Sequence, residues 1–220
     1  MARDRIDPAQ PRTEDTAGPE QGKLREAGLE VQLPDGLRAL RDHVVGAFSD
    51  LEVLGFRGEL TLVAPVERLI ELLTFCRDDR TVGCEYLMDL SAVHWPGGKV
   101  AEQAHETTGW PTLYTERPGR IEVDYILSSV THNHRFRVRV EVPDEDAVLP
   151  TAAKLYGSAN FMEREVYDFF GVRFEGHPNL ARILMPDQWE GHPHRKDYPL
   201  GGVHVQYKGA MIPPPDERKY

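Results

Sequence analysis

The N-terminal half of the chain has two kinds of apolar spacing. Over residues 37–48 apolar side chains recur at helical intervals, which predicts an amphipathic helix. The runs 51–56 and 59–63 are short and rich in apolar residues, and only Arg57 and Gly58 separate them. Two such runs joined by a tight polar turn predict a pair of adjacent strands.

The pattern continues as a second helix followed by strands. Pro65 precedes a run with apolar residues at helical spacing, and residues 84–93 predict a strand. Residues 121–130 predict another strand, and residues 135–142 alternate strictly between polar and apolar side chains. Such alternation predicts a strand with one solvated face and one buried face. The stretch 95–120 is rich in Gly, Pro and Thr and predicts a surface insertion between strands.

This order of elements predicts an α+β fold over residues 31–171. We expect a single compact domain in which a small mixed or antiparallel sheet is flanked by helices. Residues 1–30 contain few large apolar residues and several Pro and Gly. Such a segment cannot bury enough surface to offset the entropy of ordering, so it is predicted to be a disordered tail.

The chain changes character after Gly171, a residue suited to the left-handed end of the preceding helix. Residues 172–220 contain many prolines, which exclude long helices, but they also carry many large apolar side chains. An extended segment this apolar is predicted to be an arm that lies along another protein. Trp189 and Arg195 are its expected anchors, because Trp and Arg dominate interface hot spots.

The helix before this arm carries several charged residues. Asn160 and Glu163 have the spacing of a capping box. Arg164 and Asp168 are four residues apart and are expected to pair, while Glu165 and Asp168 are expected to share an acidic face. Two carboxylates three apart could also serve as metal ligands or acid–base groups. With no second carboxylate–histidine pair of the kind found in bundle metal sites, a solvated or interface face is the better interpretation.

Composition excludes several functions. A net charge of −10 at pH 7 argues against a nucleic-acid binder, which needs clustered Lys and Arg. The two cysteines, Cys76 and Cys84, predict a reducing compartment and cannot supply the four thiolates of an iron–sulfur cluster. No apolar run approaches the roughly 20 residues that span a bilayer, and no signal peptide is evident. The protein is predicted to be cytoplasmic and to reach a membrane only through partners.

The histidines allow two interpretations. His177, His192 and His194 could form a zinc site together with a carboxylate, and His192 and His194 would point to the same side of an extended strand. Metal sites, however, usually draw their ligands from rigid elements. The other interpretation is that these histidines form hydrogen bonds within turns.

An ordered set of short motifs fills the region from residue 163 to residue 199. These are EREVYDFFG at 163–171, FEGHP at 174–178, RIL at 182–184, GHP at 191–193 and RKDYP at 195–199. The set resembles the signature of the 30-kDa subunit family of respiratory complex I, the NADH:quinone oxidoreductase. His194 is a departure, since it stands where the family usually has an aliphatic residue.

The resemblance implies a non-catalytic structural subunit in the hydrophilic arm of a proton-translocating enzyme. In that enzyme electrons pass from NADH through FMN and iron–sulfur centres to a membrane quinone. It implies that this chain holds no cofactor, that FMN and the clusters belong to partner subunits, and that the partners are chiefly the quinone-site subunits D and B and the cluster-bearing subunit I. It also implies a peripheral location on the cytoplasmic side of the cell membrane. The residues expected at the subunit interface are Glu163, Arg164, Glu165, Asp168, His177, Arg182, Trp189, His192, Arg195, Lys196, Asp197 and Tyr198.

Two alternatives stay open from the sequence. A homologous subunit of a membrane-bound hydrogenase or a related dehydrogenase would share the motifs. A stand-alone metal-binding enzyme built on the histidines belongs to a different functional class.

Overall fold

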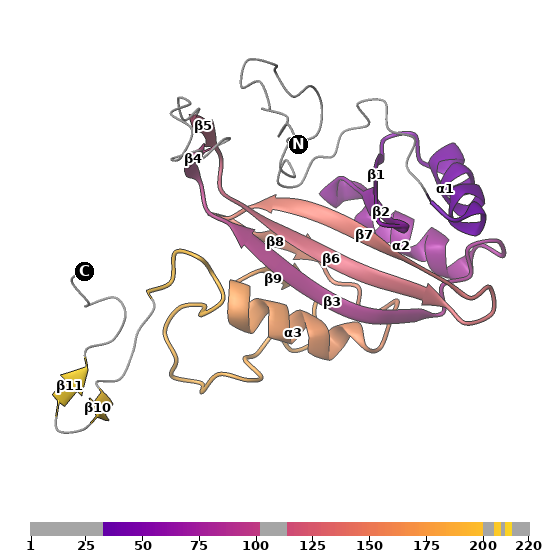
Figure 1. The fold of residues 1–220 in the computed structure, drawn as a ribbon. Coiled ribbons are helices and arrows are strands. Elements are labelled where there is room, and N and C mark those ends of the chain that lie inside the picture. The colour runs from indigo at the N-terminus through magenta and orange to yellow at the C-terminus, as the bar shows by residue number, and fades with distance from the viewer. Residues whose placement is uncertain (1–32, 102–113, 200–204, 208–209, 213–220) are drawn as a thin grey trace, which may run out of the picture.

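The computed structural model describes residues 33–101, 114–199, 205–207 and 210–212. The predicted tail, residues 1–30, lies outside the described residues, as does most of the chain beyond residue 199. The described part contains a helix-and-sheet domain followed by a long irregular segment that runs beside its last helix (Figure 1).

A five-stranded mixed sheet forms the centre of the domain. In space its strands follow the order β1 (Glu52–Phe56), β2 (Glu59–Val63), β7 (His134–Pro143), β6 (Arg120–Ser129) and β3 (Tyr86–Trp95). The β2–β7 pair is parallel, and the other neighbours are antiparallel. Both residues of the β1–β2 turn have positive φ, 51° at Arg57 and 80° at Gly58, as the tightest hairpin turns require. The predicted pair of adjacent strands is therefore present, and the strands predicted at 121–130 and 135–142 form the antiparallel β6–β7 hairpin.

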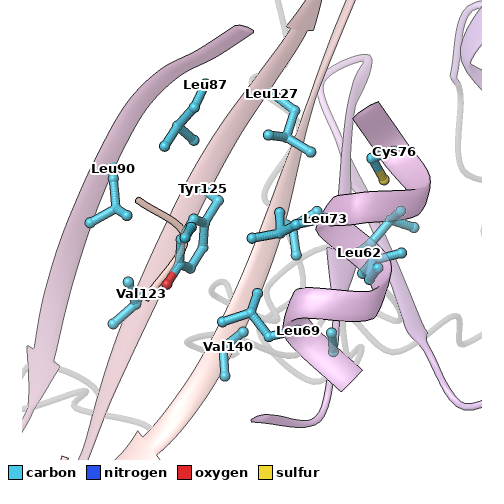
Figure 2. Packing of buried hydrophobic residues seen from close by; sticks show 14 of the residues in the cluster. Leu62, Leu69, Leu73, Cys76, Leu87, Leu90, Val123, Tyr125, Leu127 and Val140 are labelled. Carbon is cyan, nitrogen blue, oxygen red and sulfur yellow. The ribbon is translucent and has the colours of Figure 1, made fainter. Parts of the chain in front are cut away.

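Three helices accompany the sheet. They are α1 (Asp35–Ala47), α2 (Leu69–Asp78), which follows the single-turn 3-10 helix η1 (Val66–Arg68), and α3 (Ala159–Phe170). Leu69 and Leu73 of α2 lie beside Leu127 and Val140 of the sheet, and all four side chains are fully buried (Figure 2). Buried residues of α1 and α3 belong to the same hydrophobic cluster. One face of the sheet thus packs on the helices, and the predicted α+β class is confirmed.

Three short strand pairs complete the described structure. In the stretch predicted as a surface insertion, β4 (Gly98–Ala101) pairs with β5 (Tyr114–Arg117). Near the C-terminus β10 (Val205–Tyr207) pairs with β11 (Ala210–Ile212). The third pair is parallel and joins β8 (Val148–Pro150) to β9 (Arg173–Glu175).

The β8–β9 pair changes where the domain ends. Val172 and Phe174 follow the predicted boundary at residue 171, yet both side chains are buried in the hydrophobic core. The amide of Arg173 also donates a hydrogen bond to the carbonyl of Ala147, at 2.9 Å. The fold of the domain therefore continues past residue 171, and the predicted arm does not begin there.

Candidate functional site

Glu163 lies inside the domain and does not cap its helix. The N-cap of α3 is Ser158, which makes no side-chain cap bond, so the predicted capping box is wrong. The fully buried Glu163 carboxyl instead accepts hydrogen bonds from Thr151 Oγ1 at 2.5 Å and from the Ala152 amide at 2.6 Å. Burial raises the pKa of Glu163 above its ordinary value, although these two bonds favour the carboxylate. Glu163 thereby ties α3 to the segment that follows β8.

Asp168 is the second buried carboxylate of α3, and it gathers the chain that follows the helix. Its Oδ2 accepts the backbone N–H groups of Ile183, Leu184 and Met185 at 3.0, 2.8 and 2.9 Å. Its Oδ1 accepts a hydrogen bond from Arg182 Nη1 at 2.7 Å. Burial alone would raise the pKa of Asp168, but the hydrogen bonds from the backbone and from Arg182 outweigh it and hold the pKa at about 2. Asp168 is therefore an ionised anchor for residues 182–185.

Two predictions about the surface of α3 are wrong for the same reason. Arg164 does not pair with Asp168; it donates hydrogen bonds to the carbonyls of Ala181 and Arg182, at 3.0 and 3.1 Å. Glu165 is exposed whereas Asp168 is buried, so the two carboxylates do not share an acidic face. In both cases Asp168 is turned toward the later chain and away from solvent.

The end of α3 meets residues 191–194. Gly171 ends the helix with φ 81°, as predicted, and a Cβ at this glycine would lie 2.7 Å from Cδ2 of His192. His192 Nδ1 lies 3.0 Å from the Asp168 carbonyl, so this nitrogen carries the proton and donates. The ring of His194 stacks on Phe169 with a centroid separation of 4.0 Å. Together these contacts hold residues 191–194 against the C-terminal turn of the helix.

A third anchor point joins the segment to the edge strand β3. His94 is fully buried there, and its Nδ1 accepts the Lys196 amide at 2.8 Å while its Nε2 lies 3.2 Å from Asp144 Oδ2. Arg195 donates to the Asp144 carbonyl at 3.0 Å and pairs with Asp197 through two hydrogen bonds, at 3.1 and 3.0 Å. His94 and Asp144 were missed by the sequence analysis. The only available signal was a histidine on the buried face of an alternating strand.

The three histidines considered as zinc ligands are engaged separately. His177 Nε2 donates to the Asn160 carbonyl at 3.0 Å, and its Nδ1 accepts the Asn179 amide at 3.0 Å. Within the part of the chain that the structure describes, no three His, Cys, Asp or Glu side chains gather as a metal site. The structure thus does not bring the three histidines together around a common point: the His177 and His192 rings bond to backbone carbonyls of α3, and the His194 ring stacks on Phe169.

Most of the predicted interface residues therefore hold the segment 176–199 in place. Tyr198 belongs to this group, since its hydroxyl donates to the Glu190 carbonyl at 3.2 Å. Several large apolar side chains of α3 and of this segment remain exposed. These are Phe161, Leu184, Trp189 and Ile183, with exposed fractions of 61%, 58%, 38% and 37%, and we call them the α3 patch. The segment is thus an irregular layer on the domain, and it presents apolar groups outward.

Comparison with known proteins shows which family the chain resembles. Residues 62–204 match the family model "Respiratory-chain NADH dehydrogenase, 30 Kd subunit". The C subunit of the NADH-quinone oxidoreductase of Mycolicibacterium paratuberculosis is 46% identical over 169 residues, which cover 76% of this chain and 64% of that protein. The protein of the same name from Acidothermus cellulolyticus is 45% identical over 163 residues, covering 74% of this chain and 76% of that protein.

The fold has a counterpart among solved structures. A chain of the membrane-bound sulfane sulfur reductase, an archaeal respiratory membrane complex, superimposes with a TM-score of 0.52 at 23% identity. The superposition covers 74% of this chain and 85% of that one, and it supports the fold alone. The family match spans both buried carboxylates, all three anchor points and the α3 patch. The chain therefore belongs to the family of the 30-kDa subunit of respiratory-chain NADH dehydrogenase.

Proposed function

We propose that this chain is a non-catalytic structural subunit of a proton-translocating NADH:quinone oxidoreductase. The enzyme passes electrons from NADH through FMN and iron–sulfur centres to a membrane quinone. Membership of the 30-kDa subunit family and the similarity to C subunits of NADH-quinone oxidoreductases support this assignment. The chain spans 64% of the length of the Mycolicibacterium relative.

The observation that carries the proposal is the α3 patch and the way it is held. Leu184 follows Arg182 and Ile183 directly, and all three are bound to the Asp168 carboxylate through side chain or backbone. For a protein that works alone, holding apolar side chains in contact with water is energetically unfavourable, and buried charged hydrogen bonds would give it no benefit there. It suits a subunit interface, where ordering the surface in advance reduces the entropy lost on binding. Trp and Leu side chains can then be buried against the partner.

Cofactors are proposed to reside in partner subunits. Cys76 and Cys84 are both buried in the core, and burial raises the pKa of both thiols, that of Cys84 to about 12. Thiols in this state are poor metal ligands, because coordination requires the thiolate. An iron–sulfur cluster would also need four such ligands. The chain's own contribution is then assembly and rigid support of the electron path.

The partners are proposed to be the quinone-site subunits D and B and the cluster-bearing subunit I. We place the chain at the cytoplasmic face of the cell membrane, held there by these subunits. Within the described residues no helix has the length and apolar character to cross a bilayer.

Co-purification tests the proposal. An affinity-tagged full-length chain is expressed in the cells that produce it, and membranes are solubilised in mild detergent. The expected eluate contains subunits with FMN and iron–sulfur clusters and oxidises NADH with a quinone acceptor. Recovery of hydrogenase subunits without an FMN- and NADH-binding subunit would favour the hydrogenase alternative. Recovery of the chain alone, with bound stoichiometric zinc, would favour the metal-binding one.

A further inference from the structure

A second surface lies on the face of the sheet that points away from the helices. Alternation along β6 and β7 sends the core residues to one side and the charged residues to the other. The charged set on this face consists of Arg120, Glu122, Asp124, Arg135, Arg137, Arg139 and Glu141. We call it the open face. Isolated charges would be explained by a face that is simply solvated. These residues instead form an ion-pair network, with an arginine at its edge that is unpaired within the described structure.

The centre of the open face is already neutralised by ion pairs. Arg139 holds both oxygens of Asp124 at 2.7 and 2.9 Å, and its Nη1 lies 3.0 Å from Glu122. Arg120 Nη2 contacts Glu122 at 2.8 Å. The exposed fraction of the Glu122 side chain is only 2%, so this carboxylate is largely desolvated before any partner arrives.

The edge of the same ion-pair network is incomplete. Arg135 is exposed, and among the described residues its guanidinium has neither a hydrogen-bond nor an ion-pair partner. Arg137 makes only long contacts: its Nη2 lies 3.6 Å from Glu59, its buried Nε lies 3.4 Å from Asp124 Oδ2 without hydrogen-bond geometry, and its Nη1 donates to Thr61 Oγ1 at 3.3 Å. Within the described part of the chain Arg135 therefore has no acceptor for its exposed donors, and the carboxylate contacts of Arg137, two residues along the same strand, are too long for strong hydrogen bonds.

These donors border a pocket of about 380 Å³ with an apolar floor. Ile126 and Met88 line it beside the two arginines, and a β-bulge between Leu87 and Asp89 displaces Met88 outward, where it is 50% exposed. The pocket also contains two carboxylates that are already engaged. Glu59 contacts Arg137, and Asp89 Oδ1 accepts the Leu90 amide at 2.9 Å. What the pocket lacks is an anion for Arg135.

We propose that in the assembled complex this pocket receives an Asp or Glu side chain of a neighbouring subunit, with an aliphatic side chain beside it packed on Ile126 and Met88. The carboxylate would accept charge-assisted hydrogen bonds from Arg135, next to the positive charge of Arg137. Methionine at the wall can adapt its shape to the aliphatic group. This inference rests on the proposed function as a subunit. It adds a second docking surface on the opposite layer from the α3 patch.

Charge reversal tests the inference in the assembled enzyme. Arg135→Glu is compared with Arg38→Glu, a matched reversal of an exposed arginine on α1 in the helix layer. Both variants should melt like the wild type, because neither side chain is buried. In co-purification from solubilised membranes, Arg135→Glu should lower incorporation at least about tenfold, as expected for an unpaired interfacial charge. Arg38→Glu should leave incorporation unchanged.

Oxidative labelling of Met88 is the second measurement, and it keeps the inference falsifiable if a variant fails to fold. Oxidation of Met88 should slow at least about tenfold in the complex relative to the free wild-type chain, since access controls the rate. The inference would be overturned if Met88 were oxidised equally fast in both states. It would also be overturned if Arg135→Glu were incorporated normally while the wild type co-purifies, and in either case the proposed function would still stand. If the free chain were a dimer in which Met88 resists oxidation, the open face would bind a second copy of the chain. That result would also overturn the inference.

Discussion

Replacing Asp168 with asparagine probes the anchor that shapes the α3 patch. Asparagine has nearly the same size, so the substitution removes charge without opening a cavity. It takes the counter-ion from Arg182, whose Nη1 lies 2.7 Å from Asp168 Oδ1 in the wild type. It also weakens the charge-assisted hydrogen bonds from the amides of residues 183–185. The helix itself should remain intact, because its core residues are untouched.

The expected cost is large because the carboxylate is fully buried. Removing one partner of a buried ion pair typically destabilises a protein by about 3–5 kcal/mol. The stability contributed by the ionised carboxylate also follows from its pKa. The pKa of Asp168 falls from an ordinary 3.8 to about 2 on folding, which corresponds to about 2 kcal/mol of stability. The two estimates describe the same carboxylate, so they should not be added.

The pH dependence has a definite sign. Because folding depresses the pKa of Asp168, its contribution is fully present above about pH 4 and is lost as the pH falls toward about 2. Asparagine does not titrate. The difference in unfolding free energy between wild type and variant should therefore be constant from pH 5 to pH 7 and shrink by about 2 kcal/mol on acidification to pH 2. Urea unfolding at a series of pH values measures this difference.

Glu165→Gln is the matched control, since it removes a carboxylate from the same helix at an exposed position. It should change the unfolding free energy by less than about 0.5 kcal/mol. The reasoning fails if Asp168→Asn costs less than about 1 kcal/mol, the value of an exposed pair. It fails equally if the gap between wild type and variant does not narrow in acid.

Three further outcomes are expected. The raised pKa of Glu163 should make the unfolding free energy of the wild type fall as the pH rises above about 4.5, and Glu163→Gln should remove this fall. Urea unfolding from pH 4 to pH 8 measures it, and an equal fall in both proteins would contradict the expectation. His94→Leu should cost about 1–3 kcal/mol and accelerate hydrogen exchange at the Lys196 amide, which loses its acceptor; unaltered exchange there would refute the anchor. The purified chain should be colourless and unable to oxidise NADH, and a stoichiometric flavin or cluster spectrum would contradict that expectation.

The sheet and helices were predictable because their signals are local. Strict alternation over residues 135–142 matches the buried and exposed faces of β7, and the turn residues Arg57 and Gly58 adopt the backbone that their position demands. The strand predicted at 84–93 is present but shifted to Tyr86–Trp95. Glycine at residue 171 likewise ends α3 as predicted, since its left-handed φ depends on the helix alone.

The site was only partly predictable because its contacts join distant parts of the chain. Glu163 has the right spacing for a capping box with Asn160. Folding instead brings Thr151, from the loop after β8, within hydrogen-bond distance of the Glu163 carboxyl group. The i,i+4 rule favoured an Arg164–Asp168 pair, but a buried position offering three backbone amides and Arg182 stabilises Asp168 more than a surface pair can. Several residues of the motifs turn out to anchor the segment after α3, whereas their partners and burial depended on the tertiary fold.

Docking of this subunit through the α3 patch can be tested by following how well a patch variant enters the complex. Leu184→Asp combined with Trp189→Ala alters two exposed side chains of the α3 patch, and Val130→Asp, at a 72% exposed position in the β6–β7 turn, is the control. Both proteins should unfold like the wild type. In complexes isolated from solubilised membranes, the double variant should be depleted at least about tenfold and the control should be present at wild-type levels. A double variant that assembles as well as the wild type would contradict the claim that the α3 patch docks this subunit.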